Sequence, residues 1–357
     1  MNAALQDAGH PSHVVDYPVD DMTITVRAEL TMGQLATVLA QHHQQLPIDA
    51  EDDSQTIGEL VMRDVAGPRQ YGCGTLRDYV IGIEAVDGHG RRFHAGGRVV
   101  KNVAGYDLCR LLVGSEGHLG QVTMVTLKVR PLPPATALIA AAFPDVSQLA
   151  AVLERLNTSA TTPVILDVVN DVAARRLFGS TFAGLSGMSS GPPARPAVAY
   201  LLIGFDGSPE ACRWQPGIIA RELSTFTTDL QPQEQSGAFA DWCRIAQQAS
   251  RPEADAAWLS RLTILPSRVA SAVAQASTAG CEIFGRAGSG ILFVRPPAGR
   301  QVDESATLRR LQPLLAPPGG SLRVLKGNTE FNTRPSLSVQ QLSMALQQAL
   351  ATTGSAN

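Results

Sequence analysis

The sequence predicts an α+β fold in two domains, residues 1–134 and 135–357. Three observations support this fold class. Glycines recur between positions 58 and 120 and separate short β-like runs, as they do where a chain turns or approaches a ligand closely. Pro131, Pro133 and Pro134 form a stiff segment typical of a domain boundary. Beyond it, single strand-like runs alternate with helix-like runs, which predicts a second domain with an antiparallel sheet.

Composition narrows the possible functions. The 357 residues are 44% hydrophobic and 17% charged, with a net charge of -3 and no long Lys or Arg run, which argues against nucleic-acid binding. No apolar run reaches the roughly 18 residues of a membrane span. Met1–Asp20 lacks the apolar centre of a secretory signal.

The cysteines do not form a recognisable site. They are five in number, scattered, and without a C-x-x-C pair: Cys73, Cys109, Cys212, Cys243 and Cys281. This spacing argues against a zinc site, an iron–sulfur site and a disulfide framework. We therefore expect reduced thiols, no metal site and a cytoplasmic protein.

In the first domain, periodicity predicts two strands, a helix and a hairpin. Thr31 is a typical N-cap residue for the predicted helix, and Asp87-Gly88 is a typical hairpin turn. The segments are a strand at Met22–Ala28, a helix at Met32–His43, hairpin strands at Tyr79–Val86 and Arg91–His94, and a strand at Gln121–Val129.

The second domain alternates strands with helices, with a loop rich in Gly, Ser and Pro at Phe178–Pro196. The predicted strands are Ala137–Phe143, Val164–Val168, Ala197–Phe205, Trp258–Leu265, Ile291–Val294 and Leu322–Val324. The predicted helices are Pro144–Leu156, Asp171–Leu177, Pro209–Leu223, Phe239–Ala249, Pro266–Thr278, Ala306–Leu315 and Val339–Ala351.

Three glycine-containing motifs follow one another in the first domain. They read T-I-G-E with A-G-P-R and Y-G-C-G-T-L-R-D from Thr56 to Asp78, K-N-V-A-G-Y-D-L from Lys101, and G-S-E-G-H-L-G from Gly114. By themselves these glycines are equally consistent with turns in a β domain. Their order resembles the second half of the FAD-binding (PCMH-type) domain of the vanillyl-alcohol oxidase/p-cresol methylhydroxylase flavoproteins, and most of all the flavin-binding subunit of bacterial glycolate oxidase.

The resemblance implies a partial PCMH-type FAD domain followed by an α+β cap. It places FAD against eight residues: Gly58, Ala66, Gly67, Pro68, Gly72, Arg77, Gly120 and Val122. Lys101 and Tyr106 would lie near the flavin or pack the domains together. The motif pattern departs from the family in two places. The residues before Met22 contain no glycine-rich phosphate loop, and Glu59 replaces a glycine, where its charge would oppose the FAD diphosphate.

The resemblance also implies a function. The chain would be the FAD-binding subunit of a glycolate-oxidase-like complex that oxidises a 2-hydroxy acid to a 2-oxo acid and passes electrons through FAD. Its partners would be a larger flavoprotein subunit and an iron–sulfur subunit, which would bring it to a membrane surface. The alternative is a non-catalytic structural subunit that has lost FAD.

The second domain offers little catalytic machinery. All seven histidines precede residue 135, so the cap has no histidine to bind a metal or to take a proton from a substrate. Arg286 is either a bidentate ligand for a substrate carboxylate or a surface arginine. We assign no catalytic residue from sequence, and expect substrate oxidation to occur on the larger partner.

Overall fold

A computed structural model describes residues 13–97, 107–179, 197–226, 230–233, 236–254, 256–315, 320–333 and 344. By their contacts these residues form two compact units. The first contains the described residues up to Gly67 and those of Gly74–Leu132. The second contains Pro68–Cys73 and the described residues of Pro133–Thr333. One short segment of the predicted first domain therefore packs in the second unit.

The first unit is built on a five-stranded antiparallel sheet of order β1-β2-β6-β4-β5. Its strands are β1 (Val14–Asp16), β2 (Thr23–Arg27), β4 (Val80–Val86), β5 (Arg92–Gly96) and β6 (Gln121–Lys128). A separate pair joins β3 (Gln44–Gln45) to β7 (Arg130–Pro131). The predicted strands and the hairpin are thus confirmed, and β1 is an addition.

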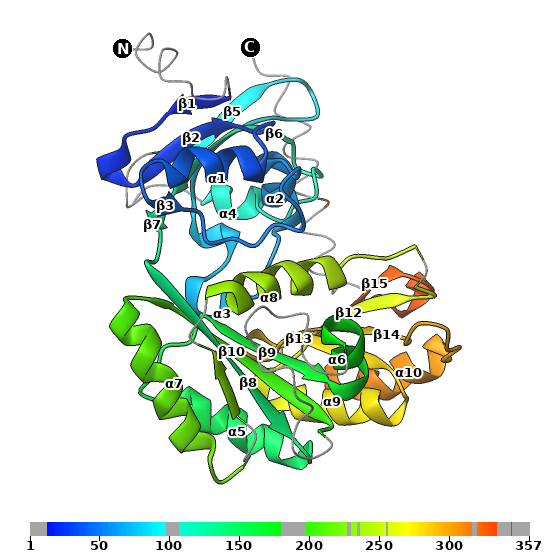
Figure 1. The fold of residues 1–357 in the computed structure, drawn as a ribbon. Coiled ribbons are helices and arrows are strands. Elements are labelled where there is room, and N and C mark those ends of the chain that lie inside the picture. The colour runs from blue at the N-terminus through cyan, green and yellow to red at the C-terminus, as the bar shows by residue number, and fades with distance from the viewer. Residues whose placement is uncertain are drawn as a thin grey trace. The chain divides into compact units, whose positions relative to one another are not determined.

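Helices α1 (Met32–Ala40), α2 (Ile57–Arg63) and α4 (Leu108–Leu112) pack with this sheet around one apolar core (Figure 1). Two 3-10 turns, Val19–Asp21 and Leu76–Asp78, complete the unit. Thr31 caps α1 as predicted, in a capping box with Gln34. The helix is shorter than expected, since it ends at Ala40 and His43 has left-handed backbone with φ 52°.

The second unit is an eight-stranded antiparallel sheet of order β11-β8-β10-β9-β13-β14-β12-β15. The strands are β8 (Ala135–Phe143), β9 (Ile165–Asn170), β10 (Ala199–Gly207), β11 (Leu230–Gln233), β12 (Leu259–Thr263), β13 (Glu282–Arg286), β14 (Ile291–Arg295) and β15 (Ser321–Lys326). The six predicted strands are confirmed; β11 and β13 were not predicted.

Helices cover both faces of this sheet, so its central strands are buried throughout (Figure 1). One face carries the main apolar core with α5 (Ser147–Asn157), α7 (Pro209–Leu223), α9 (Val269–Thr278) and α10 (Glu304–Leu311). On the other face lie α6 (Asp171–Phe178) and α8 (Ser236–Ala249), joined by a contact between the rings of Phe178 and Trp242. The remaining helix, α3, is the short segment Gln70–Cys73.

Some predictions fall outside the described residues. These are the helix at 339–351, apart from Met344, together with Lys101, Tyr106 and most of the loop at 178–196. Short 3-10 turns extend two other predicted helices, at Pro266–Arg268 before α9 and at Gln312–Leu315 after α10. A further turn, Ala287–Ser289, links β13 to β14, and one at Thr329–Phe331 follows β15.

Candidate functional site

The T-I-G-E motif is the capped start of α2. Thr56 is the N-cap, and its hydroxyl accepts a hydrogen bond from the N–H of Glu59 at 3.2 Å, while the Glu59 carboxylate accepts from the N–H of Thr56 at 3.0 Å. The N–H groups of Ile57 and Gly58 donate to the carbonyl oxygens of Leu30 and Ala28, at 2.8 and 2.9 Å. All three amides that open the helix are therefore used within the chain.

Gly58 has a packing role in this arrangement. A Cβ at this position would lie 2.9 Å from the Cβ of Ala28, so that only glycine lets α2 approach the end of β2. Since its N–H also bonds to Ala28, Gly58 positions the helix. The structure assigns Glu59 the same kind of role, because its carboxylate bonds to the start of its own helix.

Ala66 and Gly67 follow α2 and differ from Gly58. Gly67 is buried, and a Cβ there would overlap the side chain of Asp49. No hydrogen bond leads from the N–H of Ala66 or Gly67 to any other described residue. A buried main-chain N–H normally has a partner. These two amides are thus available to an acceptor such as a phosphate or carbonyl oxygen.

Arg77 contacts the C-terminal end of α2. Its Nη2 donates to the carbonyl oxygen of Val113 at 2.9 Å and lies 3.3 Å from Oδ2 of Asp64, the C-cap residue of α2. Asp64 has left-handed backbone with φ 48°. Arg77 therefore ties the end of α2 to the end of α4.

The G-S-E-G-H-L-G motif also packs on α2. The N–H groups of Gly114 and Glu116 donate to the carbonyl oxygens of Val61 and Met62, both at 2.9 Å, and so satisfy carbonyls of the last helical turn. The main-chain N–H of His118 donates to the carbonyl oxygen of Ser115 at 2.9 Å. This hydrogen bond spans Glu116 and Gly117, whose φ values are 52° and 80°. Two successive positive φ values identify a type I′ turn.

Gly120 and Val122 lead from this turn into β6. Gly120 has φ 146°, and a Cβ there would lie 2.8 Å from the carbonyl oxygen of Val86. Val122 is buried and pairs with Ala85 of β4. Next to Gly120, Leu119 lines a largely apolar pocket of about 360 Å³ in the first unit. The lining residues are Asp87, Arg91, Arg92, Phe93, Leu108, Leu111, Leu112 and Leu119.

Pro68 and Gly72 lie in the second unit. Gly72 belongs to α3, and its N–H donates to the carbonyl oxygen of Val164 at 3.2 Å. A Cβ on Gly72 would lie 2.7 Å from the Cα of Val164, so that α3 packs closely on the residues before β9. The eight predicted residues are therefore divided, with six in the first unit and Pro68 and Gly72 in the second.

Arg286 has neither of the two roles that the sequence suggested, a ligand for a substrate carboxylate or a surface arginine. It is 1% exposed, and its guanidinium donates to Oε1 of Gln247 at 2.8 Å and to the Ser250 hydroxyl at 3.3 Å. The same group lies over the Phe293 ring, 5.4 Å from its centroid. Arg286 is a buried structural arginine that ties β13 to α8 and to the residue after it.

Sequence reasoning missed the buried carboxylate of Asp167. It lies opposite Arg286 in the pairing of β9 with β13, is fully buried, and accepts a hydrogen bond from Nε1 of Trp242 at 2.9 Å. The signal was an aspartate inside the apolar run I-L-D-V-V, since buried carboxylates need polar partners.

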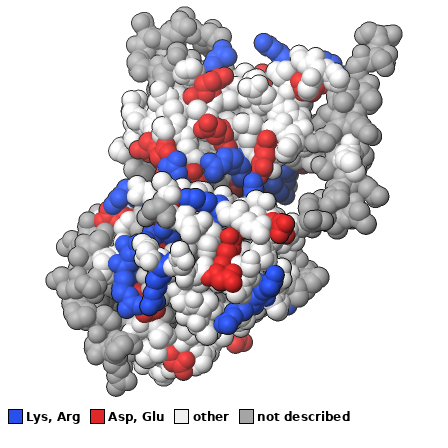
Figure 2. All heavy atoms as spheres, turned by 90° about the vertical axis from the view of Figure 1, so that its right-hand side faces the viewer, with Lys and Arg blue, Asp and Glu red and all other residues white. Residues whose placement is uncertain are grey.

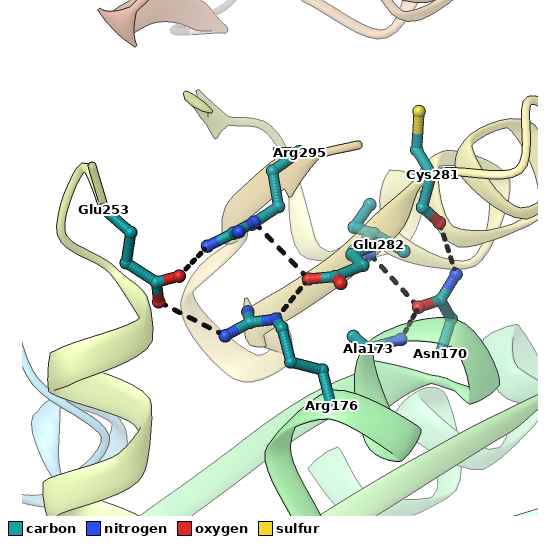
Figure 3. A network of polar contacts seen from close by, with 8 residues as sticks. Asn170, Ala173, Arg176, Glu253, Cys281, Glu282 and Arg295 are labelled. Carbon is teal, nitrogen blue, oxygen red and sulfur yellow. Dashed lines mark hydrogen bonds and ion pairs between the residues drawn. The ribbon is translucent and has the colours of Figure 1, made fainter. Parts of the chain in front are cut away.

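A second network, only partly buried, lies at the start of β13 (Figure 3). Glu282 accepts a hydrogen bond from Nε of Arg176 at 2.6 Å and lies 3.6 Å from Nε of Arg295. Glu253 pairs with both arginines, at 3.4 and 2.8 Å. Burial raises the pKa of Glu282, and the two guanidinium groups and the hydrogen bond from Arg176 oppose this effect. With its charges paired among themselves, this cluster is a structural connection between α6, β13 and β14.

Asn170 connects the same elements through its side-chain amide (Figure 3). Its Oδ1 accepts hydrogen bonds from the N–H groups of Ala173 and Ile283, and its Nδ2 donates to the carbonyl oxygen of Cys281 at 2.9 Å. The Cys281 thiol is buried, and burial raises its pKa to about 11. Burial likewise raises the pKa of the Cys109 thiol to about 11, so neither thiol is a ready nucleophile at neutral pH.

Among the described residues, no group of three or more His, Cys, Asp or Glu could hold a metal ion. None of the described helices is long and apolar enough to cross a membrane. On the face drawn in Figure 2, basic side chains lie among acidic ones over both units.

Comparison with known proteins gives a match for the first part of the chain. A family model described as an FAD binding domain matches residues 7–96. The fold resembles that of alkyldihydroxyacetonephosphate synthase, with a TM-score of 0.67 over 94% of this chain and 64% of that one. At 14% identity, this likeness concerns the fold alone. Residues 7–96 thus match an FAD binding domain, and both the predicted fold class and FAD as the cofactor of the matching family are confirmed.

Several curated relatives match part of the chain by sequence. Glycolate oxidase subunit GlcE of Escherichia coli (strain K12) is 38% identical over 125 residues, or 34% of this chain and 36% of the relative. D-lactate dehydrogenase of Archaeoglobus fulgidus is 32% identical over 130 residues, 36% of this chain and 29% of the relative. Glycolate oxidase subunit GlcD of Bacillus subtilis is 30% identical over 162 residues, 45% of this chain and 34% of the relative. The chain thus matches about a third of each relative's length.

Proposed function

We propose that this protein is the FAD-binding subunit of a glycolate-oxidase-like complex that oxidises a 2-hydroxy acid. The observation that carries the proposal is the pair of available amides at Ala66 and Gly67, inside a segment that matches an FAD binding domain. The relatives support the substrate class, since they are named as glycolate oxidase subunits and a D-lactate dehydrogenase. The two units would then correspond to a flavin domain and a cap.

The residues divide into binding and positioning groups under this proposal. Ala66 and Gly67 would donate to polar atoms of FAD, while the backbone from Gly120 to Val122 would hold its adenine end, with the pocket beside Leu119 receiving the ring. Gly58 and Arg77 would position these segments from the two ends of α2. FAD, when bound, supplies the electron transfer, and the protein contributes binding and orientation.

The complex we propose contains a larger flavoprotein subunit and an iron–sulfur subunit. Substrate oxidation would take place on the larger subunit, because the cap of this chain contains no histidine to act as a base. The subunit would be cytoplasmic and reach the membrane surface only through its partners.

A non-catalytic subunit without FAD is the second candidate. The observation that favours it is the start of α2, where the amides of Ile57, Gly58 and Glu59 are all bonded within the chain and the Glu59 carboxylate is close by. On this reading, the flavin fold serves only to hold the partner subunits together.

The visible spectrum of the purified protein, with released flavin quantified, tests between the two candidates. Near-stoichiometric FAD supports the proposal, and a folded, colourless protein that takes up no added FAD overturns it. Gly67→Ala should weaken FAD binding by about tenfold or more, because the new Cβ would displace the segment from Asp49. Gly88→Ala is the matched control, since a Cβ there meets nothing within 4 Å.

A further inference from the structure

The chain leaves the first unit directly after the two available amides. Ala66 and Gly67 belong to the first unit, Pro68–Cys73 packs in the second, and the first unit resumes at Gly74. Residues of the first unit therefore flank Pro68–Cys73 at both ends, whereas the segment itself packs in the second unit. Its conformation limits where Gly67 can lie, since Pro68 is the next residue and has a fixed φ.

Two glycines shape the seat of this segment, which is the place in the second unit where Tyr71 and Gly72 pack. A Cβ on Gly288, in the turn between β13 and β14, would overlap the ring of Tyr71. The Tyr71 ring thus occupies the space that a side chain at position 288 would need. The next residue of α3, Gly72, donates its N–H to the carbonyl oxygen of Val164 and has no room for a Cβ against that residue.

A polar contact completes the seat. The Tyr71 hydroxyl donates to Oδ1 of Asn157, at the end of α5, at 3.4 Å. Burial raises the pKa of Tyr71, so the hydroxyl keeps its proton and remains a donor at neutral pH. Three elements of the second unit therefore position one aromatic side chain that lies four residues after Gly67.

We infer that the second unit sets the affinity of the first for FAD, by seating Tyr71 on Gly288 and so fixing the amides of Ala66 and Gly67. This inference rests on the proposed function, which gives those amides to FAD. Tyr71, Gly72 and Gly288 are positioning residues. Coupling between sites is reciprocal, so FAD binding would in turn stabilise the seat of Tyr71.

Two variants of the full chain disturb the seat in opposite ways. Gly288→Ala adds a methyl group where the Tyr71 ring lies, and Tyr71→Ala removes the ring. Each should raise the dissociation constant for FAD about tenfold, measured by flavin fluorescence. The double variant should bind FAD no worse than Tyr71→Ala alone, because the added methyl group then displaces nothing. Gly217→Ala is the matched control, since a Cβ there meets nothing within 4 Å.

Hydrogen exchange in the absence of FAD gives a second readout. In Gly288→Ala and Tyr71→Ala, the amides of Ala66 and Gly67 should exchange faster than in the wild type, while those of β2 and β6 keep their protection. Unchanged exchange at Ala66 and Gly67 overturns the inference, as does an unchanged FAD dissociation constant. If the wild type binds no FAD and yet exchange at these amides rises in both variants, the proposed function fails and the positioning by the second unit stands.

Discussion

At the start of α2, one carboxylate determines how the surrounding motif is interpreted. Glu59 stands where the flavoprotein pattern has a glycine, and sequence alone placed its charge against the FAD diphosphate. In the structure, its carboxylate accepts from the N–H of Thr56, and its own N–H donates to the Thr56 hydroxyl. A capping box of this kind satisfies two amides that would otherwise be without partners at the helix start.

Glu59→Gly should therefore destabilise the protein without improving FAD binding. It removes the capping interaction and places a glycine within the helix, which together should lower the free energy of unfolding by about 1–2 kcal/mol, measured by urea unfolding. Glu59→Gln is the matched control, because glutamine keeps the capping geometry without the charge. FAD binding that becomes several-fold tighter in Glu59→Gln would contradict this assignment and restore the repulsion expected from sequence.

The hairpin β4–β5 shows how a turn is held at the scale of an element. Asp87 was expected in this turn because Asp-Gly pairs favour it. Its carboxylate accepts hydrogen bonds from the N–H groups of His89 and Arg91, at 2.9 and 3.0 Å, and from Nε of Arg91 at 2.7 Å. Asp87 and Arg91 also line the pocket beside Leu119, so the contacts between them shape its wall.

The hairpin should lose stability in acid. Desolvation raises the pKa of Asp87, but the hydrogen bonds from Arg91 and His89 and the charge of Arg91 outweigh it, so the pKa lies below the ordinary value of 3.8. A lowered pKa means that the ionised carboxylate stabilises the fold above pH 3.8, and that this contribution is lost as pH falls through the lower, folded pKa.

Unfolding of wild type and Asp87→Asn across this pH range measures the effect. The wild type should lose stability more steeply below pH 3.8 than the variant. Arg91→Gln should remove part of the same pH dependence, since it takes away the charged partner. Parallel pH profiles for wild type and Asp87→Asn would show that the turn does not depend on this carboxylate.

At the scale of the whole molecule, the two units rely on different interactions. The first has a single apolar core between its sheet and three helices. The second places charged side chains inside its sheet, with Glu282 and Arg295 each 1% exposed. Removing one member of a buried ion pair is far more costly than removing an exposed one, because it leaves the other charge buried without its partner.

Glu282→Gln should lower the free energy of unfolding of the second unit by about 3 kcal/mol. All three tryptophans, Trp214, Trp242 and Trp258, lie in this unit, so tryptophan fluorescence in urea follows its unfolding alone. Hydrogen exchange of β2 and β6 follows the first unit, which should be unaffected. Glu210→Gln, at an exposed pair with Arg213, is the control and should change little. An equal loss in both units would show that they unfold together.

Some of the fold was predictable because local signals were sufficient. Thr31 predicted the start of α1, and the alternation in Thr23–Arg27 predicted β2. By contrast, β13 was missed because the charged residues Glu282 and Arg286 are atypical of a buried strand, and their burial depends on partners distant in sequence. The helix α2 was missed because its first residues matched a cofactor loop, whereas they are held by the end of β2 and by Leu30.

The eight cofactor-binding residues remain a prediction, and sequence did not separate their roles for a similar reason. The motifs pointed to Ala66 and Gly67, and the structure leaves their amides available. Sequence did not distinguish these two residues from Gly58, because a glycine that donates to a ligand and one that packs on Ala28 look the same in a motif. Only the partners of each N–H group separate the two roles.

The sequence by itself determined the α+β class, most of the strands and the resemblance to FAD-binding proteins, since these follow from periodicity and from short motifs. The tertiary structure alone decided which glycines pack and which leave a donor available, and that Glu59 caps a helix. It also decided that Pro68–Cys73 packs in the second unit. The physical reason is that Tyr71 and Gly288 are far apart in the chain, and only folding shows that one side chain fills the space left by the other.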